Sequence, residues 1–139
     1  MIRKVKKNNQ KYQKNFILNS PYHILEVANC HGGSFRYVMS LIEEFKDIRF
    51  CQGMKFQPFK YSSLALDDYE WYETYKKLYF KRSQWREIVE KTYKYKNVWI
   101  DIFDNYSLKI LNENKKKIYG IKIQSSVLFN ESLLSKLIK

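Results

Sequence analysis

Cysteine is scarce in this sequence of 139 residues, which holds only Cys30 and Cys51. Two cysteines are too few for a disulfide framework, and no CxxC spacing or Cys/His cluster indicates a zinc site. A reduced, cytoplasmic setting fits this usage best. No stretch approaches about 18 uninterrupted apolar residues, and the basic start of the chain lacks the hydrophobic run of a signal peptide. The sequence therefore predicts neither a membrane span nor secretion.

Acidic residues are also in short supply, with 14 Asp and Glu against 26 Lys and Arg, which leaves a formal charge of +12. Such an excess suits either nucleic acid or a small anionic substrate. Residues 1–20 form a polar, basic leader, which we interpret as a solvated tail, so we expect no nucleic-acid partner. The chain is 45% apolar, enough to bury the core of one domain over the remaining residues.

Short apolar runs alternate with helical patterns after residue 20. We expect buried strands over 22–27, 54–57, 98–103 and 119–124. Helices are expected after caps at Ser34, Ser83 and Asn105, within 67–80 and around 133–138. This alternation predicts an α/β fold with a parallel sheet and right-handed crossovers. Neither GxGxxG nor GxxxxGK[ST] occurs, so a nucleotide-binding open sheet loses its main support.

Polar residues lie in or at the end of all four predicted strands. They are Glu26, Lys55, Gln57, Asp101, Asp104, Lys122 and Ser125. A charged group in a parallel sheet is costly unless it is paired or bound, and ligands bind at the carboxyl ends of such strands. One interpretation is a cradle in which Lys55 and Lys122 bind a phosphate or carboxylate. The other is an internal salt-bridge network of the two lysines with Glu26 and Asp101. The alternative interpretation of Asp104 is that it marks the start of a helix.

Two further features have ordinary structural explanations. His31 lies in the glycine-rich turn after the first strand, where a histidine is more often a hydrogen-bonded structural residue than a base. The Tyr- and Trp-rich stretch over 68–75 interleaves acidic residues with the aromatics, which repels a phosphate backbone. We interpret that stretch as a packed lid or subunit contact.

Four segments together resemble the N-acetylneuraminate (sialic acid) synthase family. They are YHILEVANCHGG at 22–33, MKFQ at 54–57, IDIFD at 100–104 and YGIKIQS at 119–125. Their order and spacing match the family from about residue 21 to the end of the sequence. The resemblance implies that residues 21–139 form four βα units, the first half of a (β/α)8 TIM barrel, truncated after the fourth unit.

The resemblance also implies a function. Members of the family condense phosphoenolpyruvate with N-acetylmannosamine or a related amino sugar and use a divalent metal, Mn or Mg. By position, Lys55, Gln57, Lys122 and Ser125 would hold the phosphate and carboxylate of phosphoenolpyruvate. Glu26 would be the catalytic residue, facing sugar hydroxyls or the reacting centre. The family's metal ligands lie on later strands, so we expect none in this chain.

The chain departs from the family at three places. Ala28 and Cys30 stand where the family usually has Gly and Asn, and Asp101-Ile102 stands where it usually has Thr-Pro. A half barrel also exposes two strand edges. We therefore expect a homodimer, a separately encoded second half that completes the ring, or a truncated remnant. The alternative function is a catalytically inactive half barrel that serves as an interaction or polyanion-binding protein.

Overall fold

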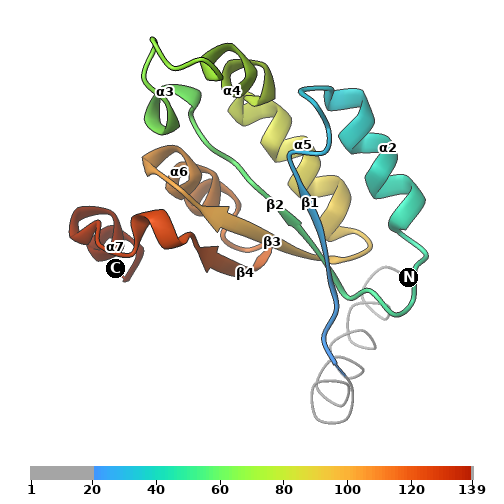
Figure 1. The fold of residues 1–139 in the computed structure, drawn as a ribbon. Coiled ribbons are helices and arrows are strands. Elements are labelled where there is room, and N and C mark those ends of the chain that lie inside the picture. Colours follow the sequence, from blue (N-terminus) through green and yellow to red (C-terminus); the bar gives the residue numbers. More distant parts are fainter. Residues whose placement is uncertain (1–20, 139) are drawn as a thin grey trace.

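The computed structural model describes residues 21–138, which form a four-stranded parallel sheet covered by helices (Figure 1). The strands are β1 (Ile24–Ala28), β2 (Gly53–Phe56), β3 (Asn97–Ile102) and β4 (Ile118–Ile123). They lie in the order β1-β2-β3-β4, and every neighbouring pair is parallel. Because the order never reverses, right-handed crossovers all fall on one face, as in a barrel rather than a doubly wound sheet. The predicted α/β fold is confirmed, whereas the basic leader lies outside the described residues.

The connections between strands hold the helices. They are α2 (Phe35–Phe45), α3 (Tyr61–Leu64), α4 (Tyr72–Leu78), α5 (Arg82–Tyr93), α6 (Asn105–Asn114) and α7 (Glu131–Ile138), with a 3-10 turn η1 (Ser125–Val127) after β4. Helix α5 lies between α2 and α6, and both α5 and α6 contact β3. Helices α3 and α4 contact each other beyond the carboxyl end of β2 (Figure 1). Every described helix is too short or too polar to cross a membrane.

The hydrophobic core lies between the sheet and these helices. The strands contribute Val27, Met54, Phe56, Val98, Ile100 and Ile102, each at most 2% exposed. The helices contribute Val38, Ile42, Trp85, Ile88, Val89 and Ile110. Because successive strand residues point to opposite faces, the residues between these core positions lie on the face away from the helices, which we call the inner face.

Two helices begin earlier than predicted. Helix α6 is capped by Asp104 rather than Asn105: Oδ1 of Asp104 accepts a hydrogen bond of 2.8 Å from the backbone N–H of Ser107. Helix α5 starts at Arg82, so the predicted cap Ser83 lies inside it. The expectation that Asp104 starts a helix is therefore confirmed, since a carboxylate satisfies a free N–H at the helix start.

The turn after β1 places three residues in the left-handed region. Ala28 has φ 44°, Gly32 has φ 55° and Gly33 has φ 84°. A Cβ at Gly33 would also lie 2.3 Å from the backbone oxygen of Lys77, so only glycine fits there. Ala28 is strained, because the left-handed region costs a residue with a Cβ about 1–2 kcal/mol. The β1–β2 register shifts between Glu26 and this alanine.

Replacing Ala28 with glycine should raise the free energy of unfolding by about 1 kcal/mol, because the strain is removed. Ala65, with φ −139°, is a matched control in extended backbone. There, Ala65→Gly should lower the free energy of unfolding by up to about 1 kcal/mol, because the unfolded chain gains freedom. Urea unfolding measures both variants, and destabilisation by Ala28→Gly would show that the turn is unstrained.

Candidate functional site

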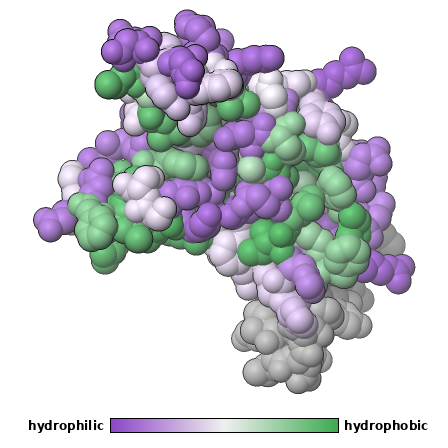
Figure 2. Space-filling view, viewed as in Figure 1, coloured by the Kyte–Doolittle hydropathy of each residue, from purple (hydrophilic) through white to green (hydrophobic). Residues whose placement is uncertain are grey.

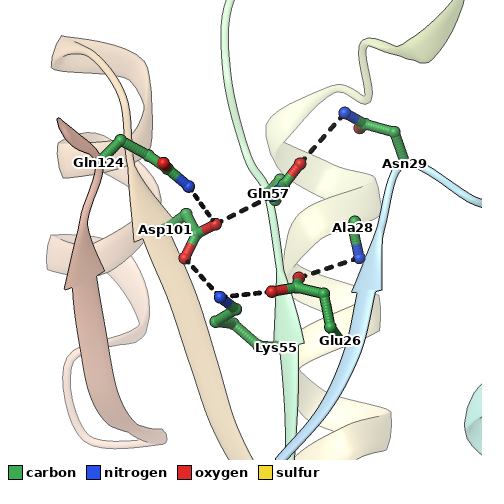
Figure 3. Close-up of polar contacts among 7 residues, drawn as sticks. All are labelled: Glu26, Ala28, Asn29, Lys55, Gln57, Asp101 and Gln124. Carbon is green, nitrogen blue, oxygen red and sulfur yellow. Dashed lines mark hydrogen bonds and ion pairs between the residues drawn. The ribbon is translucent and has the colours of Figure 1, made fainter. Parts of the chain in front are cut away.

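An ion-pair network joins the first three strands on the inner face (Figure 3). Lys55 on β2 places its ammonium between the carboxylates of Glu26 on β1 and Asp101 on β3. Its Nζ lies 3.3 Å from Oδ1 of Asp101 and pairs with Oε2 of Glu26. Lys55 and Glu26 are direct partners in the β1–β2 ladder, so their side chains leave the sheet on the same face. The salt-bridge interpretation thus holds for Lys55.

Asp101 is the buried member of this network, with none of its surface exposed. Its Oδ2 accepts hydrogen bonds from Nε2 of Gln57 at 3.0 Å and from Nε2 of Gln124 at 2.6 Å. Its Oδ1 makes no hydrogen bond within residues 21–138 and faces the Lys55 ammonium. Two amides and one cation therefore offset the cost of burying this carboxylate.

Asn29 and Gln124 are members of the site that the sequence reasoning missed. Nδ2 of Asn29 donates a hydrogen bond of 3.1 Å to Oε1 of Gln57, which fixes the amide of Gln57 so that its nitrogen points to Asp101 (Figure 3). Gln124 follows Lys122 by two residues and lies directly after the end of β4, so an extended chain turns both side chains to one face. This spacing of two residues from Lys122 is the sequence signal by which Gln124 could have been identified.

The charge of Lys55 is set by opposing influences. Burial by itself lowers the pKa of Lys55, but the hydrogen bond to Glu26 and the attraction of Asp101 and Glu26 outweigh burial and raise the pKa above its ordinary value. Lys55 is therefore a cation at neutral pH. Because two carboxylates surround one ammonium, an incoming anion must compete with them for it.

Lys122 lies on the same face but on β4, which β3 separates from the strand of Lys55. Its Cα is the ladder partner of Asp101, so its side chain also leaves the sheet on the inner face. The side chain is exposed, and none of the ion pairs within residues 21–138 includes it. Ser125, at the start of η1, is exposed as well. The structure groups Glu26, Lys55 and Gln57, while binding of an anion by Lys122 and Ser125 stays a prediction.

Aromatic rings fill the inner face on the amino-terminal side of this network. The ring centroid of Tyr22 lies 5.9 Å from those of Trp99 and Tyr119, and the Trp99 and Tyr119 centroids are 5.6 Å apart. A Cβ at Gly53 or Gly120 would lie 2.8 or 2.4 Å from the indole of Trp99, so glycine on both neighbouring strands leaves room for it. The polar side chains therefore occupy the carboxyl end of the sheet, where barrel enzymes bind ligands.

The surface view agrees with this arrangement. Figure 2 shows hydrophilic residues across the middle of the face, with hydrophobic residues on both sides. The side chain of Glu26 is 43% exposed, whereas that of Lys55 is 11% exposed. The ion-pair network thus has a solvent-accessible edge at β1.

His31 is a buried structural residue in the turn after β1, as its position predicted. Its Nδ1 accepts a hydrogen bond of 3.0 Å from the backbone N–H of Gly33, and its ring centroid lies 4.6 Å from that of Phe80. Its Nε2 is buried and has no hydrogen-bond partner in the described part of the chain. Burial lowers the pKa of His31 below its ordinary value.

This lowered pKa makes stability depend on pH with a definite sign. The folded state binds the proton less readily than the unfolded state, so the free energy of unfolding falls as pH drops below the unfolded pKa of about 6.5. His31→Asn keeps an acceptor near the Nδ1 position and removes the titration. Between about pH 7.5 and pH 5, the wild type should lose more thermal stability than this variant. Parallel pH profiles of the two melting temperatures would contradict the account of His31.

A metal ion does not fit the described residues. Within residues 21–138, no three His, Cys, Asp or Glu side chains come together at one point. Glu26 and Asp101 are the carboxylates closest to such a role, and the Lys55 ammonium lies between them. We therefore derive no metal-dependent step from this chain.

Four consecutive parallel βα units, with helices outside and polar side chains inside, define part of a TIM-barrel-type fold. The chain is similar to the N-acetylneuraminic acid (sialic acid) synthetase of Leptospira borgpetersenii serovar Hardjo-bovis, whose crystal structure was determined in complex with citrate. The match has a TM-score of 0.73 at 23% sequence identity, and covers 84% of this chain and 40% of that synthetase. No family model and no curated protein matches the sequence. The predicted resemblance is thereby confirmed at the level of the fold.

Proposed function

We propose that this chain provides half of the substrate-binding inner face of a sialic-acid-synthase-like protein, which condenses phosphoenolpyruvate with N-acetylmannosamine or a related amino sugar. The observation that carries this proposal is the position of Lys55, a cation held on the inner face at the carboxyl end of the sheet. A fold shared with a sialic acid synthetase supports the same substrate class. The chain spans 40% of that synthetase, so the complete reaction needs further βα units.

Binding of the anion would proceed by exchange of carboxylates at Lys55. Glu26 is half exposed and lies on the edge strand β1, so its carboxylate is free to turn away when a phosphate or carboxylate of the substrate approaches. Lys122 on β4 would contribute the second cation, because phosphoenolpyruvate carries two acidic groups. Once displaced, the Glu26 carboxylate would accept hydrogen bonds from sugar hydroxyls.

Asp101 would limit the affinity of this site. Its carboxylate is buried, hydrogen-bonded to Gln57 and Gln124, and close to the same ammonium. It cannot turn to solvent as Glu26 can, so its negative charge would persist beside a bound anion. The residues that would hold the divalent metal implied by the resemblance are expected on units outside the described residues.

Removal of either inner-face lysine should abolish binding of phosphoenolpyruvate, because each supplies one of the two cations that the substrate needs. Isothermal titration calorimetry of Lys55→Ala and Lys122→Ala tests this expectation. Lys109 is exposed on α6 and provides the control, since Lys109→Ala removes the same charge from the helix side. Unchanged binding in both inner-face variants would overturn the assignment. A wild-type chain that binds no phosphoenolpyruvate would favour the inactive half-barrel alternative.

Neutralising Asp101 should have the opposite effect. Asp101→Asn keeps the shape of the side chain and removes the charge that competes with the substrate, so affinity for phosphoenolpyruvate should rise about tenfold. The same titration measures it, with circular dichroism to confirm that the variant folds. Weaker binding by a folded Asp101→Asn chain would mean that Asp101 assists the anion and does not oppose it.

A further inference from the structure

Three side chains converge on the carboxylate of Asp101, and we call them the carboxylate site: Lys55, Gln57 and Gln124. The Nε2 atoms of Gln57 and Gln124 lie 3.0 and 2.6 Å from Oδ2, and Nζ of Lys55 lies 3.3 Å from Oδ1. The donors come from β2 and β4, the strands on both sides of β3 (Figure 3). A cation at one oxygen and two N–H donors at the other is how a protein recognises a bound carboxylate.

The two amide donors are held in place by contacts that do not involve the Asp101 side chain. Nδ2 of Asn29 donates a hydrogen bond of 3.1 Å to Oε1 of Gln57, which leaves the Nε2 end of that amide to face Asp101. The backbone N–H of Gln124 donates a hydrogen bond of 3.3 Å to the carbonyl oxygen of Ile102, so this segment stays beside β3. The carboxylate site is therefore preorganised by its own surroundings.

Lys55 has one partner that can exchange and one that cannot. The side chain of Glu26 is 43% exposed, and its Oε1 also accepts a hydrogen bond of 3.2 Å from the backbone N–H of Ala28. Asp101 has no exposed surface. An anion in solution can thus replace Glu26 on the β1 side of the ammonium, whereas Asp101 closes the β3 side.

We propose that Asp101 is an internal ligand, whose carboxylate permanently occupies the carboxylate site. The site takes one planar carboxylate, because it supplies one cation and two amide N–H groups in fixed positions. A free monocarboxylate cannot enter while Asp101 fills the site, so an anion reaches Lys55 only from the β1 side. The inference goes beyond the proposed function, because it holds whether or not the chain binds phosphoenolpyruvate.

Removal of the internal ligand gives the first test. Asp101→Ala deletes the carboxylate and keeps Cβ, and formate is a carboxylate of matching size. Buried donors without an acceptor are unfavourable, so the variant should melt below the wild type, and formate should raise its melting temperature. At about ten times the dissociation constant of formate, the rise should be about 4 °C or more. Circular dichroism measures it, with sodium chloride at equal concentration as the reference for ionic strength.

Asp101→Asn is the matched control, because it changes the net charge equally but its amide fills the space. This variant and the wild type should gain no more from formate than from chloride. Acetate is one methyl group too large for the vacated space, so it should stabilise Asp101→Ala less than formate does. Equal formate responses of Asp101→Ala and Asp101→Asn would overturn the proposal, because formate would then act as a general anion.

An Asp101→Ala chain that does not fold in buffer also tests the proposal. Formate should then restore its helical circular dichroism spectrum, and chloride should not. A chain that stays unfolded at every formate concentration would overturn the proposal.

Nuclear Overhauser effects give the last test, since they locate the bound formate. In Asp101→Ala the formate proton should lie next to the methyl group that the substitution introduces and should show an effect to it. Formate that stabilises the variant without this contact binds elsewhere, which would contradict the proposal. Phosphoenolpyruvate enters none of these measurements, so their failure is distinguishable from failure of the proposed function.

Discussion

The contact of the Lys55 ammonium with the buried carboxylate of Asp101 is the interaction on which the inner face depends. A carboxylate with none of its surface exposed is stable on a strand only if cations and hydrogen-bond donors surround it, and here Lys55, Gln57 and Gln124 do so. Removing one partner would leave an uncompensated buried charge. The polar layer is therefore a connected unit, and a change at one member alters the others.

The same contact gives the chain its chemical character. A lysine without a carboxylate partner is free to bind an anion. Lys55 is already ion-paired with two carboxylates, and its pKa is raised. A substrate anion would bind by replacing the movable Glu26 while the fixed Asp101 remains. Under the proposed function, affinity for phosphoenolpyruvate would depend on one cation at the centre of the network and a second at Lys122.

Much of the fold could be predicted from the sequence. The alternation of apolar runs and helical patterns predicted the four parallel strands, because apolar residues recur with different periods in buried strands and in amphipathic helices. Helix starts were harder, since Asp104 and Asn105 are both good caps and only the local backbone decides between them. The strain at Ala28 could not be predicted, because a positive φ arises from the turn and not from the residue type.

The candidate site was predicted in part. Strand polarity indicated that Glu26, Lys55 and Gln57 gather towards the carboxyl ends of the strands, and the structure joins them in one network through Asp101. The sequence pattern could not decide between an anion cradle and a salt-bridge network. That choice depends on side-chain geometry across strands that are far apart in the sequence. Asn29 was missed for the same reason: its contact with Gln57 joins residues on either side of a helix.

The most direct measurement of the central claim follows the side-chain nitrogen of Lys55 itself. In a chain labelled with ¹⁵N at lysine Nζ, the Lys55 signal is assigned from its loss in the Lys55→Arg variant. Titration with phosphoenolpyruvate should shift this signal and that of Lys122 together, with saturation at one ligand per site. An unchanged Lys55 signal, with gradual shifts spread over surface lysines, would contradict the account.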